Sequence, residues 1–265
     1  MTTATPIDAS APTVIRTRLG LDPLTLFAAV IPASIGLVFT RDLVVPLVFL
    51  GIGLALALIV SRVSARVLAL LVLALPVAIV ALALLFALWV DPATVADTRV
   101  AVGIAGRDLT VGALTVGAAT ALRLAAITAL LFAAGSAADG PDLVRALVQH
   151  LRVPYRVGYA ALAALRFVPR FARELDVIRR AHRVRDAAAP GPFTALARGF
   201  GYAVPLLAGA IRHAERVALA MDARAFGAHA TRTEPRVARW HRLDTAVVAG
   251  GWVLTVAVFV VVAAS

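Results

Sequence analysis

Five long apolar runs dominate the sequence. They cover residues 24–40, 43–60, 67–90, 109–138 and 245–264, and the only charged side chain within them is Arg123, in the fourth run. About 17 to 25 apolar residues in a helix cross the hydrocarbon core of a bilayer. With 61% hydrophobic residues and a mean hydropathy of +0.91, the chain is too apolar for a soluble domain of this size. We therefore predict an all-α integral membrane protein with about five transmembrane helices.

Positive charge is concentrated in one hydrophilic segment. All 26 basic residues are arginines, and eighteen of them lie between Ser136 and Leu243, where eight acids also lie. This segment therefore carries ten of the eleven net positive charges of the chain. We predict four parts: an N-terminal cytoplasmic tail at 1–23, a four-helix transmembrane part at 24–138, a basic cytoplasmic segment at 139–242 and a C-terminal transmembrane helix at 243–265.

The arginines also predict the orientation of the spans. Arg16 and Arg18 precede the first span, Arg62 and Arg66 separate the second from the third, and the basic segment follows the fourth. Since arginine-rich loops stay in the cytoplasm, we expect a multi-pass protein of the cell inner (plasma) membrane, with the N-terminus inside and the C-terminus outside. A polar leader precedes the first run, which exceeds the usual ~7 to 15 apolar residues of a signal peptide. We expect this run to remain as a span.

Arg123 would lie near the middle of the fourth span. A charge at that depth costs free energy and normally faces the bundle interior or a water-filled cavity. Two interpretations stay open. Arg123 could have a coupling role inside the membrane, or it could be a structural arginine satisfied by carbonyl groups of a neighbouring helix.

The basic segment is predicted to form amphipathic helices. Pro141 and Asp142 favour a helix start, and that helix runs to about Arg152. A longer helix is expected from about Val157 to Arg185, with a kink or a junction of two helices at Pro169, and a third at 204–226. In the two longer helices, apolar residues recur every three or four positions and arginines occupy the other faces. Such helices should lie as a layer along the cytoplasmic face.

Each of the two longer helices ends with an arginine inside a short tripeptide. The tripeptides are Val184-Arg185-Asp186 and Ala223-Arg224-Ala225, and their arginines are 39 residues apart. An arginine near a helix C-terminus is stabilised by the helix dipole and by the last carbonyls, by roughly 0.3 to 1 kcal/mol. A purely structural role is therefore one interpretation of both arginines.

Longer sequence blocks surround these tripeptides. The first block is Ala164-Leu165-Arg166-Phe167-Val168-Pro169-Arg170-Phe171, followed by Glu174, Ile178, Ala181 and Arg185, and the second is Ala220-Met221-Asp222-Ala223-Arg224-Ala225-Phe226. Over residues 123–226 the chain resembles the transmembrane (T) component, EcfT, of energy-coupling factor (ECF) transporters, a family related to the cobalt-type permeases. Asp142 to Leu147 and Val153-Pro154 also match the pattern of this family in order and spacing, and Arg123 stands where the family tends to carry an arginine.

This resemblance implies a non-catalytic scaffold of an ATP-binding cassette (ABC) importer. The amphipathic helices would be coupling helices, and Arg185 and Arg224 would each enter a groove on one of two cytosolic ATPase subunits. A separate small membrane subunit would capture the substrate, a vitamin or a transition-metal ion. The resemblance implies no catalytic residue, cofactor or metal site in this chain.

The chain departs from the family pattern after each arginine. The family has glycine there, whereas this chain has Asp186 and Ala225. We expect the helix to continue past Ala225 to Gly227, which can take the left-handed cap. Asp186 could pair with Arg185, and an acid is unfavourable at a helix C-terminus.

Other classes of function remain as alternatives. The phosphate-binding loop of an ATPase needs a lysine, which the sequence lacks, and its five histidines have no metal-ligand spacing. A membrane-anchored basic protein could bind nucleic acid or anionic lipid. Because the arginines alternate with apolar stripes, we expect the lipid bilayer and no nucleic acid as a partner. An intramembrane lipid-modifying enzyme would need clustered acids or histidines, which the sequence does not show.

Overall fold

The computed structural model describes residues 13–15, 17, 19–60, 65–90, 99–104, 107–185, 192–229, 234 and 236–264. The helices are α1 (Thr25–Phe39), α2 (Val44–Val60), α3 (Ala65–Trp89), α4 (Val111–Ala137), α5 (Gly140–His150), α6 (Tyr155–Arg185), α7 (Pro192–Asp222) and α8 (Arg242–Ala264). Strand β1 (Thr13–Ile15) pairs in parallel with β4 (Arg236–Ala238), and β2 (Val100–Ile104) pairs antiparallel with β3 (Arg107–Thr110). The predicted all-α class is confirmed, with two short ribbons added.

The chain divides into two compact units. Unit 1 includes Leu147–Pro235 and therefore α6 and α7, and unit 2 comprises Thr13–Ala146 with Arg236–Ser265. Unit 2 contains α1 to α4, α8 and both ribbons. The five apolar runs thus fold together, and the two long amphipathic helices form a unit of their own.

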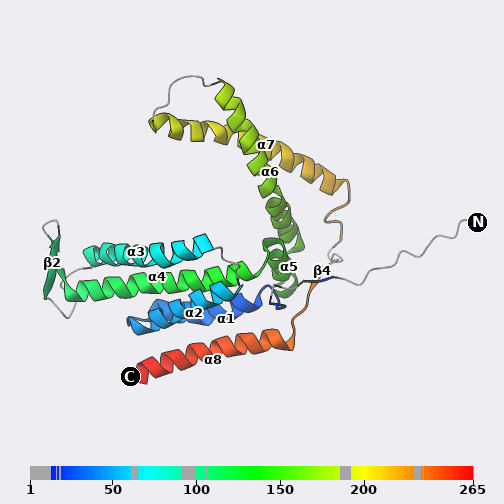
Figure 1. Cartoon of the computed structure of the whole chain (residues 1–265). Coiled ribbons are helices and arrows are strands. Elements are labelled where there is room, and N and C mark those ends of the chain that lie inside the picture. The colour runs from blue at the N-terminus through cyan, green and yellow to red at the C-terminus, as the bar shows by residue number, and fades with distance from the viewer. Residues whose placement is uncertain are drawn as a thin grey trace, which may run out of the picture. The chain divides into compact units, whose positions relative to one another are not determined.

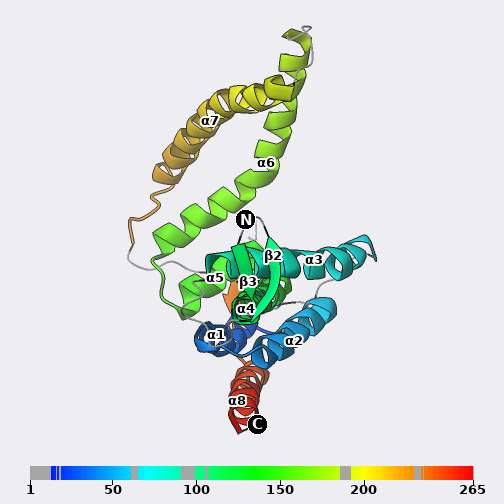
Figure 2. The ribbon, with the colours of Figure 1, turned by 90° about the vertical axis from the view of Figure 1, so that its left-hand side faces the viewer.

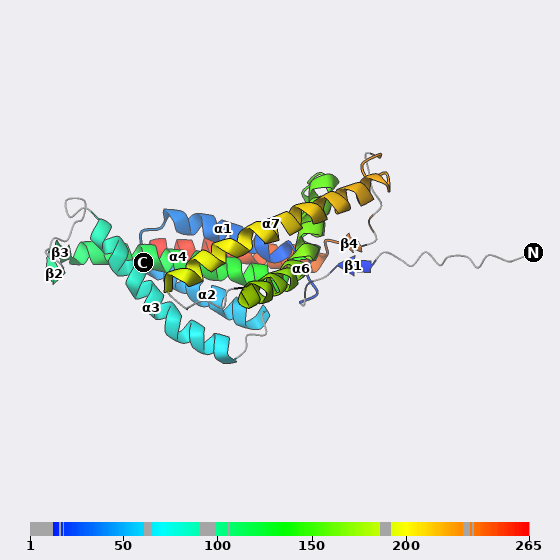
Figure 3. The ribbon, with the colours of Figure 1, turned by 90° about the horizontal axis from the view of Figure 1, so that it is seen from above.

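Helix α4 is the central helix of unit 2. It contacts α1, α2 and α3, while α8 packs mainly on α1 (Figure 2). The two ribbons lie at opposite ends of this bundle (Figures 1 and 3). The N-terminus of α4 is capped by Thr110, whose Oγ1 accepts a hydrogen bond of 3.2 Å from the Ala113 N–H.

Small residues allow the helices of unit 2 to approach closely. A Cβ added to Gly117 would lie 2.3 Å from the Ala83 carbonyl oxygen of α3, and one added to Gly53 would lie 2.9 Å from Ala129 Cβ of α4. Around these contacts the bundle buries one main apolar cluster. Its largest fully buried members include Leu37, Val45, Phe49 and Leu130.

The outer surface of unit 2 is also apolar. Exposed side chains include Ile35 and Phe39 of α1, Ile59 of α2, Val77 of α3 and Val261 of α8. Helices α4 and α8 are long and apolar enough to cross a membrane, and Thr25–Phe39, Val44–Val60 and Leu73–Trp89 are shorter apolar helices. Exposed apolar surface of this extent is unfavourable in water and suits hydrocarbon. The structure thus agrees with an all-α membrane protein.

Helix α6 runs through Pro169 as one continuous helix. Of the two arrangements expected at this proline, the junction of two helices is therefore wrong, and the kink stays a prediction. Residues on both sides of Pro169 contact α7: the Phe167 ring stacks on His213 with centroids 4.1 Å apart, and Glu174 lies against Gly209. This shared packing offsets the hydrogen bond that the proline removes.

The boundaries of α7 also differ from the expected 204–226. The helix begins at Pro192, a favourable first residue, and ends at Asp222.

Helices α6 and α7 run in opposite directions and cross within unit 1 (Figures 1 and 2). Nearer the end of α6, His182 packs edge-on against Tyr202 with centroids 5.1 Å apart. A Cβ on Gly209 would lie 2.5 Å from Glu174 Oε1, so glycine permits this close contact. Burial of the His213 ring, together with the positive charges of Arg170 and Arg216, lowers its pKa, although Glu174 acts in the opposite direction. The lowered pKa favours the neutral imidazole.

Candidate functional site

The second arginine tripeptide lies in a tight turn at the end of α7. The Phe226 N–H donates to the Met221 carbonyl at 3.0 Å, and the Ala225 N–H donates to the Asp222 carbonyl at 2.9 Å. These two bonds define a Schellman motif, in which Arg224 is the C-cap and Ala225 is the residue that takes the left-handed conformation. The motif therefore fixes the backbone of Arg224 at the end of the helix.

Ala225 adopts a φ of +53°, and Gly227 adopts +93°. The expectation that the helix continues past Ala225 to Gly227 is therefore wrong. Ala225 takes the left-handed position that glycine occupies in the family pattern, despite its Cβ. An L-residue in this conformation costs roughly 1–2 kcal/mol, so contacts elsewhere must hold the turn in place.

Replacing Ala225 with glycine is expected to stabilise the turn by up to about 1 kcal/mol, because relief of strain exceeds the entropy that glycine adds to the unfolded chain. The check is hydrogen exchange of the Phe226 amide, which should slow by up to about fivefold. Ala223→Gly is the matched control and should speed exchange, because Ala223 has no positive φ to relieve. Faster exchange in Ala225→Gly would contradict the strain.

The tripeptide Ala223-Arg224-Ala225 is exposed along its whole length. Within the described part of the chain, the Arg224 guanidinium makes no hydrogen bond or ion pair. The structural interpretation expects it to bind the last carbonyls of α7, and this contact is not seen among the described residues. The geometry leaves all of the guanidinium donors free for a carboxylate or carbonyl outside these residues.

The first tripeptide lies at the other end of unit 1. Arg185 is the last residue of α6, and the preceding Val184 side chain is 85% exposed. The Arg185 side chain and the whole of Asp186 fall outside the described residues, so the suggested pairing of these two groups falls outside them too. Arg185 is thus the last residue of its helix, whereas Arg224 lies two residues beyond the end of α7.

Arg123 lies in α4 and its Nη2 donates a hydrogen bond to the Thr40 carbonyl at the C-terminal end of α1. Its Nε atom is buried and has no hydrogen-bond partner in the parts of the chain that the structure describes. A cation at the carbonyl end of a helix is stabilised by the helix dipole. This contact favours the structural interpretation of Arg123.

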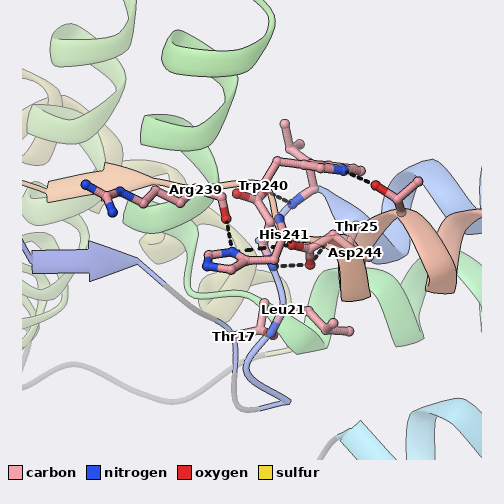
Figure 4. Close-up of polar contacts among 10 residues, drawn as sticks. Thr17, Leu21, Thr25, Arg239, Trp240, His241 and Asp244 are labelled. Carbon is pink, nitrogen blue, oxygen red and sulfur yellow. Dashed lines mark hydrogen bonds and ion pairs between the residues drawn. The ribbon is translucent and has the colours of Figure 1, made fainter.

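One polar cluster has no counterpart in the sequence predictions. The buried Asp244 carboxylate accepts hydrogen bonds from the Asp22 N–H (2.8 Å), the Thr25 hydroxyl (2.8 Å) and the His241 N–H (2.7 Å), as Figure 4 shows in part. Asp244 is the third residue of α8, so its bond to His241 resembles half of a capping box. An acid in the first turn was the available signal, but nothing in the sequence pointed to α1 as its partner.

Comparison with known proteins identifies the family. Residues 16–235 match the sequence profile of CbiQ, described as cobalt transport protein. The chain belongs to this cobalt transport family. The matched region contains Arg123, both arginine tripeptides and α1 to α7, and it ends before α8. The family resemblance drawn from the arginine blocks is thereby confirmed.

A curated relative of the family comes from Limosilactobacillus fermentum (strain CECT 5716 / Lc40), and its name is energy-coupling factor transporter transmembrane protein EcfT. It is 31% identical to this chain over 126 residues, which are 46% of this chain and 47% of the relative. The alignment therefore spans about half the length of the relative that it matches.

Proposed function

We propose that the chain is the membrane scaffold of an ECF-type ABC importer. In this role it couples ATP hydrolysis by two cytosolic ATPase subunits to the uptake of a vitamin or transition-metal ion through a separate substrate-binding membrane subunit. The chain itself is non-catalytic. The observation that supports this proposal most is the exposed Arg224 guanidinium, held at a helix end by a Schellman turn in a member of this family.

The two tripeptides are the proposed docking elements for the ATPases. Arg224, with Ala223 and Ala225, would enter a groove on one subunit, and Arg185, with Val184 and Asp186, a groove on the other. Arginine suits this task because its planar, permanently charged fork makes bidentate bonds to carboxylates. The small side chains beside Arg224 leave room for the walls of a groove.

The proposed topology places the N-terminus in the cytoplasm and the C-terminus outside, in the plasma membrane. Unit 2 is then the membrane-spanning unit and unit 1 the cytoplasmic unit. Closure of the ATPases would move α6 and α7 together, since Phe167, Glu174 and His182 of α6 each pack on α7. The spans would pass this motion to the substrate-binding subunit.

Co-purification with the ATPases tests the proposal. The full chain, expressed with the two ATPase subunits and the substrate-binding subunit, should retain both ATPases in detergent and support ATP-dependent uptake in proteoliposomes. The double variant Arg185→Glu, Arg224→Glu should lose both ATPases and uptake, because each acid would repel the carboxylates of a groove built for arginine. Wild-type retention and uptake by this variant would show that the assigned docking roles are wrong.

A further inference from the structure

The turn that carries Arg224 is held by the beginning of α6. The Phe226 ring packs edge-on against Tyr155, with ring centroids 5.7 Å apart, and against Tyr159, with centroids 5.8 Å apart. Tyr155 and Tyr159 are four residues apart and therefore lie on one face of α6. Two rings of α6 thus fix the residue that follows the Arg224 tripeptide directly.

Hydrogen bonds hold the chain beyond Phe226 to the same face of α6. Arg156 Nη2 donates to the Gly227 carbonyl at 2.9 Å, and the Tyr155 hydroxyl donates to the His229 carbonyl at 2.7 Å. The Tyr159 hydroxyl lies 3.2 Å and 3.3 Å from the two carboxylate oxygens of Glu234. A Cβ on Gly227 would lie 3.4 Å from Arg156 Nε and Nη2, so the guanidinium lies directly against this glycine.

These contacts with α6 compensate for the backbone strain at Ala225. Ala225 is held at a φ of +53° where glycine would be unstrained, so the isolated helix end favours other conformations. Phe226 is the residue whose N–H closes the Schellman motif, and it is also the residue that the two tyrosines hold. Fixing Phe226 and Gly227 therefore selects the conformation in which Arg224 is the C-cap.

We propose that Tyr155, Arg156 and Tyr159 of α6, together with Phe226 and Gly227, form a turn clamp that positions Arg224 for ATPase docking. This inference rests on the proposed function. The clamp residues are positioning residues, since they act through Arg224. The clamp also joins the start of α6 to the end of α7, so that the docking turn moves with both helices.

The expected effect follows from the population of the docking conformation. When only a fraction of the chain has the competent turn, the apparent Kd rises by the inverse of that fraction. We expect Arg156→Gln and Phe226→Leu each to raise the Kd for the ATPase subunits by about tenfold. The loss should appear as a slower association rate with an unchanged dissociation rate, because the bound turn is the same once formed.

The experiment is a double-mutant cycle with the full chain in lipid nanodiscs, read by surface-immobilised binding of the purified ATPase pair. In an Arg224→Ala background, Arg156→Gln should change the Kd by less than about twofold, because the residue through which it acts is gone. Tyr155→Phe keeps the ring and loses only the bond to His229, so it should have a smaller effect. His213→Ala loosens the α6–α7 contact at Phe167, away from both arginine tripeptides, and should leave the association rate unchanged.

Each outcome decides the inference. If Arg224→Ala weakens binding while Arg156→Gln and Phe226→Leu keep the wild-type association rate, the clamp is wrong and the docking role of Arg224 stands. If His213→Ala slows association as much as the clamp variants do, the effect is general packing and the clamp is again overturned. If Arg224→Ala itself leaves the Kd unchanged, the docking role is wrong and the clamp inference falls with it.

Discussion

Replacing Arg224 with alanine is expected to raise the Kd of the chain for its ATPase partner by about 30-fold to 4,000-fold. Truncating one partner of a desolvated interfacial charge pair costs about 2–5 kcal/mol, much of which comes from the partner charge that is left unpaired. The described structure offers the Arg224 guanidinium no internal partner, so wild-type docking breaks no contact within the described part of the chain. Titration of purified ATPase subunits against the chain in nanodiscs measures the change.

Two further variants test whether the effect comes from the bidentate geometry of the Arg224 guanidinium and whether it is specific to this position. Arg224→Lys keeps the charge but loses the bidentate geometry, so it should restore only part of the affinity. Arg212→Ala removes another exposed arginine of α7, 12 residues before Arg224, and should change the Kd by less than about twofold. An Arg224→Ala chain that binds as tightly as the Arg212→Ala chain would contradict the assignment of Arg224.

The helices of unit 2 were predictable because their signal is local. A long run without charges leaves few alternatives to a buried or membrane helix. Helices α1, α2 and α4 lie within the runs read from the sequence, whereas α3 and α8 begin two and three residues before theirs. The amphipathic helices were predictable in number and type. Their boundaries were not: Pro192 is also compatible with a helix end, whereas in the structure it is the first residue of α7.

Motif spacing singles out the arginine tripeptides, whose docking role stays a prediction, but it does not give their geometry. Whether Ala225 continues the helix or takes the left-handed turn depends on what holds Phe226, and those residues lie at 155–159, about 70 positions earlier in the chain. Local sequence favours the continued helix, since alanine is the best helix former. Contacts between residues so far apart in the chain override that preference, and they leave no pattern in the local sequence around Ala225.

The second large effect is expected at Asp244, which joins the beginnings of α1 and α8. This residue is 1% exposed, and its carboxylate accepts hydrogen bonds from the Asp22 N–H, the Thr25 hydroxyl and the His241 N–H. Asp244→Ala leaves three donors without an acceptor, and each buried unpaired group costs about 1–3 kcal/mol when water cannot replace its partner. Since the bond from the His241 N–H is only partly buried, water can replace the acceptor there, and we expect a loss of about 2–4 kcal/mol in the free energy of unfolding.

Denaturation of the purified chain in mixed micelles, followed by tryptophan fluorescence, measures this loss. Trp252 of α8 donates a hydrogen bond of 2.9 Å to the Ala28 carbonyl of α1, so its fluorescence reports on the same pair of helices.

Thr25→Ala removes one of the three hydrogen bonds to Asp244 and should lower the free energy of unfolding by about 1 kcal/mol. Thr245→Ala, beside Asp244, removes only an exposed bond to Trp240 of 2.9 Å and should cost less. If Asp244→Ala unfolds like Thr245→Ala, the carboxylate does not hold α1 and α8 together, and the packing of Gly251 against Ala29 and of Phe259 against Gly36 must suffice.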